Sequence, residues 1–148
     1  MSLTKISRQT MPGVFHANSW GTVITREVIF ELIKEARSNP NNKARLCLHP
    51  SPDEISQVTF LAFSSPYKDK IHKHPHHTEI MLPILGLASY ILFNQKGLKT
   101  DSRILSGKEL LAVSTPKEEW HAIEVLSDSF VMVEIGSGPF TYSSTVYM

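Results

Sequence analysis

The sequence predicts a mainly β protein, an antiparallel β-sandwich or jelly-roll barrel with one N-terminal α-helix. Three observations support this fold class. One helical pattern precedes Pro40, short apolar segments follow it, and polar turn residues separate those segments. Many short strands with polar turns are typical of sandwiches and barrels, whereas α/β folds alternate strands with helices.

The helix is expected after Thr25, whose hydroxyl can cap the first turn. Apolar residues then recur on one face at helical spacing as far as Ala36. Ser38 and Asn39 should end the helix, because the residue before a proline disfavours helical torsions. The residues before Thr25 show no clear period, so we expect an arm that leans on the domain or on a second subunit.

The strands are expected where Val, Ile, Leu, Phe and Tyr concentrate between turns. These segments are 45–49, 57–64, 79–85, 87–94, 102–105, 109–114, 120–126 and 130–135. No internal repeat or low-complexity linker interrupts them. We therefore expect one structural domain, with the arm and helix (residues 1–44) packed on a barrel (residues 45–148).

Composition narrows the classes of partner. The 148 residues are 41% hydrophobic and 20% charged, with a net charge of +1. This balance suits one domain with a core and gives no reason to expect nucleic acid or an anionic membrane as partner. No apolar run is long enough for a membrane span, no signal sequence is evident, and the single cysteine, Cys47, excludes an intramolecular disulfide. A cytoplasmic location is expected.

Candidate metal ligands concentrate in the segment HKHPHHTE, which runs directly into an apolar strand. Imidazole nitrogen and carboxylate oxygen are ligands that first-row divalent metals favour. Residues i and i+2 of an extended segment share a face, so His72 and His74 should project the same way. A proline then bends the chain, and Glu79 can return from the next strand. His121, in the fragment PKEEWH, begins another apolar strand face and can supply a fourth ligand.

These fragments also resemble a known family. H-x-H-x4-E-x6-G, from His72 to Gly86, resembles the first cupin motif, and P-x-x-x-W-H, from Pro116 to His121, is similar to the second. With ARLCLHPSPDE and a late GPF, they look like the WbuC-type family of cupin-fold metalloproteins. Members of that family are encoded in bacterial O-antigen and other surface-polysaccharide gene clusters. The resemblance covers roughly residues 14–140.

The sequence departs from the family pattern at two turns. Pro66 stands where a glycine usually opens the first motif, and Glu118 replaces the glycine of the second. Both differences bear on loop shape more than on ligation. The C-terminal segment TYSSTVYM also lacks the proline-containing pattern associated with the family.

The resemblance implies one divalent transition metal ion, which can be Fe, Mn, Ni or Zn. Its implied ligands are His72, His74, Glu79 and His121. Four protein ligands on an octahedral ion leave two positions for water or substrate. The alternative is a solvated histidine-rich turn that binds metal adventitiously.

Other side chains are candidates for roles beside such an ion. The candidate catalytic residues are His49, His76 and Glu118, and the candidate substrate-binding residues are Arg45, His49 and Trp120. Arg45, Cys47 and His49 alternate onto one strand face and can reach a substrate, although a surface ladder is an equal alternative. Cys47 is expected as a small buried filler. Trp120 can instead pack in the core, and Glu118 can be an exposed turn residue. His76 and His77 are not expected as primary ligands, although either can substitute for one or shuttle a proton.

Three functions fit this pattern. The first is a metal-dependent isomerase or epimerase acting on a sugar or sugar nucleotide in bacterial surface-polysaccharide biosynthesis. The others are an Fe(II)-dependent dioxygenase and a non-enzymatic, metal-dependent ligand-binding module. The expected partner is a small carbohydrate-like molecule. A homodimer is a further expectation, because unpaired sheet edges invite pairing or cover.

Overall fold

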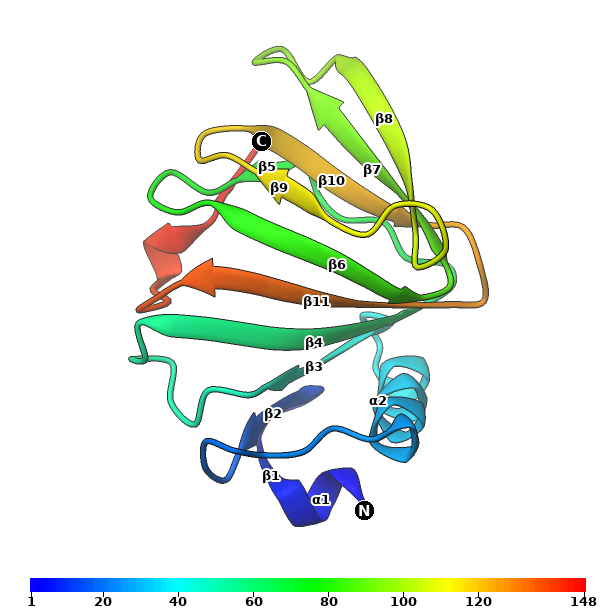
Figure 1. Cartoon of the computed structure of the whole chain (residues 1–148). Helices are drawn as coiled ribbons and strands as arrows, with labels where there is room; N and C mark the ends of the chain where they lie inside the picture. The colour runs from blue at the N-terminus through cyan, green and yellow to red at the C-terminus, as the bar shows by residue number, and fades with distance from the viewer.

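The computed structural model describes the backbone of residues 1–148 and every side chain except that of Tyr142. Two β-sheets face each other, as Figure 1 shows. The larger sheet has the order β1 (Ser7–Met11), β2 (Val14–Ala17), β3 (Lys43–Cys47), β4 (Ser56–Ser64), β11 (Ser129–Ser137), β6 (Glu79–Leu85) and β9 (Val113–Thr115). The smaller has the order β12 (Val146–Tyr147), β5 (His72–Lys73), β10 (Trp120–Val125), β7 (Leu87–Phe93) and β8 (Lys99–Ser106). The predicted mainly β sandwich is confirmed.

The apolar side chains form two clusters. One lies between the sheets and contains Met81, Tyr90, Leu105, Ile123 and Phe130 among others. The second lies between the larger sheet and helix α2 (Arg26–Ser38). The sandwich therefore has an apolar core between its sheets and a second apolar layer under α2.

Helix α2 buries the predicted apolar face. Its buried residues are Val28, Ile29, Leu32, Ile33 and Ala36. Thr25 occupies the N-cap position, but its side chain makes no capping hydrogen bond. At the other end, the Asn39 amide donates to the Glu35 carbonyl, and the chain leaves the helix in an extended conformation before Pro40. Among the described residues, no helix is long and apolar enough to span a membrane.

The residues before Thr25 are more ordered than their sequence indicates. They form a short helix, α1 (Leu3–Ile6), and the antiparallel hairpin of β1 and β2. β2 pairs in parallel with β3, whereas all the other strand pairs are antiparallel. Parallel neighbours need a crossover connection, and α2 provides it (Figure 1). The expected leaning arm is thus part of the larger sheet. Its period is unreadable because only the first of the five β1 residues is buried.

Strand limits differ from the sequence expectation where strands are short. The segment expected at 109–114 pairs only as Val113–Thr115. β5 and β12 have two residues each, which is too short for any alternation to be read. A short 3-10 helix over Tyr142–Ser144 precedes β12.

Gly86, which closes the resemblance to the first cupin motif, joins β6 to β7 with φ +81°. A Cβ there would lie 2.0 Å from the Ser129 carbonyl oxygen. We expect Gly86→Ala to lower the free energy of unfolding by at least about 2 kcal/mol. The loss is the sum of the strain of a left-handed alanine and the clash of its Cβ with the backbone. Urea unfolding measures this loss.

Gly21 provides the matched control. Its φ is +85°, and a Cβ there meets nothing within 4 Å. Gly21→Ala should therefore lose only about 1 kcal/mol, from backbone strain alone. Equal losses in the two variants would show that the Ser129 contact does not constrain Gly86.

Candidate metal centre

The two sheets bring the four predicted ligands together at one end of the sandwich. His72 on β5 is paired with His121 on β10, and His74 follows β5 directly. One ring nitrogen from each of these histidines lies within 4.8 Å of those from the other two. Glu79 begins β6 and so enters the site from the larger sheet. The cluster is nearly sealed from solvent, with His74, Glu79 and His121 only 6%, 5% and 2% exposed.

The Glu79 carboxylate lies among imidazole nitrogens. Its Oε1 atom is 3.0 Å from Nε2 of His74 and 3.6 Å from Nε2 of His77. Its Oε2 atom is 3.6 Å from Nε2 of His121. His77 is thus a member of the site that the sequence analysis did not place among the ligands. Strand parity could have identified it, because His77 and Glu79 are two residues apart and residues at this separation share a face of an extended segment.

Backbone carbonyls fix the orientation of three imidazoles. His72, His74 and His121 each place Nδ1 within 2.8–2.9 Å of a main-chain oxygen. These oxygens belong to Lys70, Ser144 and Glu119. A carbonyl only accepts, so Nδ1 donates a proton and the lone pair of the neutral ring lies on Nε2. Histidine ligands of metal ions are oriented in this way.

His74 shows that the site needs a cation. Its Nε2 atom is buried without a hydrogen-bond partner among the described residues, although Glu79 Oε1 is 3.0 Å away. A lone pair facing a carboxylate oxygen at this distance is repulsive, so either a proton or a metal ion must lie between them. The donor types and the free Nε2 atom fit a divalent transition metal ion.

The pKa values reflect the same charge pattern. Burial alone would raise the pKa of Glu79, but the imidazoles of His121, His74 and His77 outweigh burial and hold that pKa far below its usual range. Burial would lower the pKa of His74, yet the neighbouring Glu79 carboxylate raises it overall. For His72, burial and then the neighbouring His121 lower the pKa. Glu79 therefore remains an anion and a competent ligand.

The site opens onto a cavity of about 770 Å³. His72, His74, His77 and Glu79 line its wall, whereas His121 does not reach it. The other charged side chains of the wall are Arg8, Lys43, Arg45, Asp69 and Glu134. The ligand cluster is thus adjacent to a space that can hold a small molecule with several polar groups.

The pKa values of two of these wall residues are shifted. Burial and then the negative charge of Glu79 raise the pKa of Glu134 to about 7. Burial lowers the pKa of Lys43. Neither residue was a candidate from sequence. Glu134 could have been found as the lone charged residue in the apolar strand expected at 130–135.

The other sequence candidates divide into two groups. Arg45 and His49 line the cavity. His76 is exposed, Glu118 pairs with Lys73, and neither lines the cavity, so their catalytic assignment stays a prediction. Trp120 also lies outside it, with its ring centroid 4.9 Å from Lys73 Nζ, so its expected contact with substrate stays a prediction.

Glu118 nevertheless keeps the backbone shape of the glycine it replaces. Its φ is +69°, in the left-handed region that glycine occupies without strain. Its amide donates to the His74 carbonyl, which ties the turn to the ligand segment. The departure from the second cupin motif therefore changes the strain of this loop rather than its path.

Comparison with known proteins identifies the fold. A family model described as "Domain of unknown function (DUF6016)" matches residues 24–105. No curated protein sequence matches the chain significantly. Among solved structures, the capsular polysaccharide assembling protein CapF from Staphylococcus aureus is 20% identical, with a TM-score of 0.63 over 73% of this chain and 30% of CapF. The chain spans about a third of CapF.

Two further structures are similar. Oxalate oxidase in complex with glycolate is 18% identical, with a TM-score of 0.59 over 75% of this chain and 57% of that chain. KdgF from Halomonas sp. is 21% identical, with a TM-score of 0.53 over 68% of this chain and 82% of that chain. These neighbours are cupin-fold proteins, so the cupin fold is confirmed. The narrower resemblance to the WbuC-type family stays a prediction.

The ligand assignment predicts a large loss of metal affinity in His74→Ala. We expect the dissociation constant for Mn²⁺ to rise at least about 100-fold. Changes to residues behind the ligands alone lower metal affinity about 10–100-fold, and loss of a ligand should cost at least as much. Equilibrium dialysis with elemental analysis measures it. His76→Ala, at an exposed neighbour, should bind as wild type does. Equal affinities in wild type and His74→Ala would remove His74 from the ligand set.

The strained turn predicts an unusual order of stability at position 118. Glu118→Gly and Glu118→Ala both remove the ion pair with Lys73, but only glycine relieves the left-handed strain. The glycine variant should be more stable than the alanine variant by about 1 kcal/mol in urea unfolding. An alanine variant of equal or greater stability would show that this turn is unstrained.

Proposed function

We propose that this chain, which belongs to the DUF6016 family, is a metal-dependent isomerase or epimerase acting on a sugar or sugar nucleotide in surface-polysaccharide biosynthesis. One observation carries the proposal. A cluster of histidines and one glutamate opens onto a cavity that also contains the carboxyl group of Glu134 and three cationic side chains.

His72, His74, Glu79 and His121 would hold the ion. When bound there, a divalent ion supplies Lewis-acid polarisation of a substrate oxygen. The chain contributes the orientation of the site. The carbonyls behind each Nδ1 keep the imidazoles from rotating, and the buried Glu79 carboxylate balances part of the charge of the ion.

Glu134 is the proton-transfer group of this proposal. Strand register places Gly136 of β11 opposite Glu79 of β6, so Glu134 lies two residues along the same face. Its pKa of about 7 suits a general base at neutral pH. Its carboxylate takes the proton from the carbon next to the substrate carbonyl. For isomerisation, the resulting carboxylic acid returns that proton to the former carbonyl carbon, while the proton of the neighbouring hydroxyl group moves to the former carbonyl oxygen, so no external acid or base is consumed.

The cationic wall indicates what else the substrate carries. Arg8 and Arg45 project into the cavity from β1 and β3, and Lys43 lies two residues before Arg45. Guanidinium groups bind phosphate and carboxylate through paired hydrogen bonds. These side chains favour a sugar with an anionic substituent, such as a phosphate or a nucleotide diphosphate. The similarity to CapF, a capsular polysaccharide assembling protein, supports this substrate class by analogy alone.

Two alternatives use the same ligands. An Fe(II)-dependent dioxygenase needs the open coordination positions but no general base. The similarity to oxalate oxidase supports this alternative by analogy alone. A ligand-binding module needs the cationic wall alone. Glu134 distinguishes the isomerase from both, because neither alternative requires a carboxyl group that exchanges a substrate proton.

The test is solvent deuterium exchange at the carbon next to the substrate carbonyl. Wild-type protein loaded with Mn²⁺ is incubated in D₂O with sugar phosphates and nucleotide sugars, and exchange is followed by NMR. Glu134→Gln should slow exchange about 10²–10⁴-fold, the usual contribution of a general base, while it retains Mn²⁺. Glu124→Gln, at an exposed ion pair with Lys68, is the matched control and should stay within about twofold of wild type.

Each other result has a definite meaning. Wild-type exchange in Glu134→Gln would overturn the assignment of the base. Saturable binding without exchange would favour the binding module. Oxygen consumption by the iron-loaded protein would favour the dioxygenase.

A further inference from the structure

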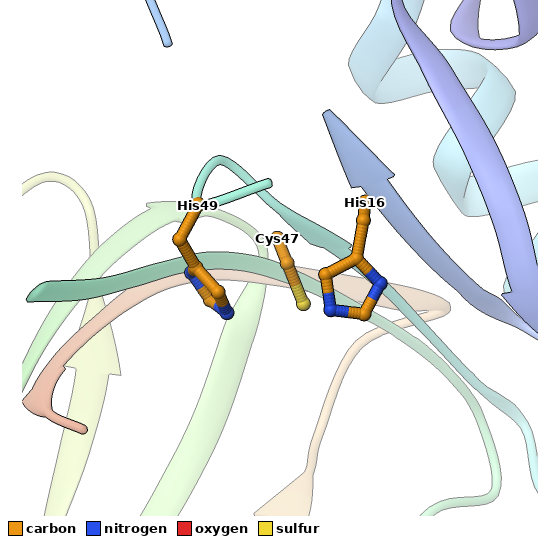
Figure 2. A group of neighbouring side chains, drawn as sticks. All are labelled: His16, Cys47 and His49. Carbon is orange, nitrogen blue, oxygen red and sulfur yellow. The ribbon is translucent and has the colours of Figure 1, made fainter. Parts of the chain in front are cut away.

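A second cluster of metal-ligand side chains lies on the same cavity wall and has no part in the function above. It consists of His16 on β2, Cys47 on β3 and His49 just beyond β3. One donor atom from each lies within 4.8 Å of those from the other two. The three residues are buried, at 9%, 6% and 2% exposure. Figure 2 shows the Cys47 side chain between the two imidazole rings.

The cluster follows from strand register. Cys47 and His49 are two residues apart and point to the same side of the chain. His16 is the partner of Cys47 in the parallel pairing of β2 with β3, so its ring lies beside the sulfur. Sequence alone could group Cys47 with His49. It could not add His16, because the βαβ crossover that brings β2 to β3 was not predicted.

The two histidine Nε2 atoms and the Cys47 sulfur are the donor atoms available to a metal ion. His16 Nδ1 lies 3.0 Å from Thr10 Oγ1. His49 Nδ1 lies 3.2 Å from both the carbonyl oxygen and the amide nitrogen of Val58. When Nδ1 carries the ring proton, which in His49 it donates to the Val58 carbonyl, the lone pair of each neutral ring lies on Nε2, the atom that is then available to a metal ion. The sulfur accepts a single long hydrogen bond of 3.8 Å, from Thr59.

We propose that His16, Cys47 and His49 form a second metal site, which takes a soft or borderline ion such as Zn²⁺ or Cu⁺ and presents an open coordination position to the cavity. Thiolate selects such ions over Mn²⁺ and Mg²⁺, whereas the first site has only nitrogen and oxygen donors. Three protein ligands with one open position are typical of zinc ions that contact substrate. On binding, the Cys47 thiol releases its proton to solvent as the metal–sulfur bond forms.

The spacing is compatible with one ion. Zinc–nitrogen bonds of about 2.1 Å and zinc–sulfur bonds of about 2.3 Å place tetrahedral donors about 3.3–3.8 Å apart. The donors of this cluster, within 4.8 Å of one another, therefore need to approach by no more than about 1.5 Å. Rotation of side chains at a cavity wall can supply this movement without a change in β2 or β3.

The site also gives the N-terminal hairpin a role. His16 comes from β2, whereas Cys47 ends β3 and His49 lies two residues beyond it. A bound ion would link these two segments through their side chains, in addition to the backbone pairing of β2 with β3. The cavity would then hold two ions of different chemical preference, one at each ligand cluster.

The experiment is a titration of the reduced, full-length protein with Co²⁺ under nitrogen. A cobalt–thiolate bond produces a sulfur-to-metal charge-transfer band in the near ultraviolet. The chain has a single cysteine, so this band can arise only at Cys47. We expect a band that saturates by about two equivalents of Co²⁺ per chain, because the first site also takes Co²⁺, and that is displaced by Zn²⁺.

Matched variants separate the two sites. Cys47→Ser should abolish the band and leave Mn²⁺ affinity at the first site within about twofold. His16→Ala and His49→Ala should each weaken Co²⁺ binding at Cys47 at least about tenfold. His74→Ala should lose Mn²⁺ but keep the band. Failure of the first site would therefore leave this test intact.

Two results would overturn the proposal. One is the absence of the band in wild type at saturating Co²⁺. The other is an undiminished band in the His16→Ala, His49→Ala double variant, which would show a lone cysteine capturing an ion. His16→Ala keeps the test available if substitutions at Cys47 or His49 prevent folding, because His16 lies on a strand near the sheet edge.

Discussion

The buried carboxylate of Glu79 is the constraint on which the site depends. An ionised carboxylate inside a protein is unfavourable unless cations or donors surround it. Here imidazoles surround it from the segment between β5 and β6, and from β10 of the opposite sheet. The two sheets are therefore joined at this end by polar contacts, whereas apolar packing holds them together in the middle. Loss of Glu79 would leave several buried imidazoles without their counter-charge.

The orientation of these imidazoles in turn depends on parts of the chain that carry no ligand. His74 directs Nδ1 to the carbonyl of Ser144, in the 3-10 turn near the C-terminus. Ser144 also accepts a hydrogen bond from the Thr141 amide, which fixes the turn. β12 then pairs with β5, the strand that carries His72. The C-terminal segment, which departs from the family pattern in sequence, thus supports the ligand cluster from behind.

Sequence predicted the parts of this structure that depend on local pattern. Helix α2 was predicted with its buried face, because its apolar residues recur at helical spacing. Most central strands were located because apolar residues concentrate between polar turns. The ligand types were recognisable because histidines and a glutamate precede an apolar strand. The hairpin of β1 and β2 was missed, since β1 is mostly exposed and β2 depends on pairing with the distant β3. His77 and Glu134 needed knowledge of which strand faces which, whereas His76 and Glu118 lie at exposed positions outside the cavity.

The two clusters divide one cavity by donor chemistry. His72, His74, Glu79 and His121 offer nitrogen and oxygen from the segments that resemble the cupin motifs. His16, Cys47 and His49 add a sulfur donor, and one of these ligands comes from the βαβ unit at the N-terminus. A thiolate changes which ion is bound most strongly, so the second cluster need not compete with the first for the same metal. The N-terminal hairpin therefore does more than extend the sheet, because it completes a ligand set that the barrel strands alone leave short by one imidazole.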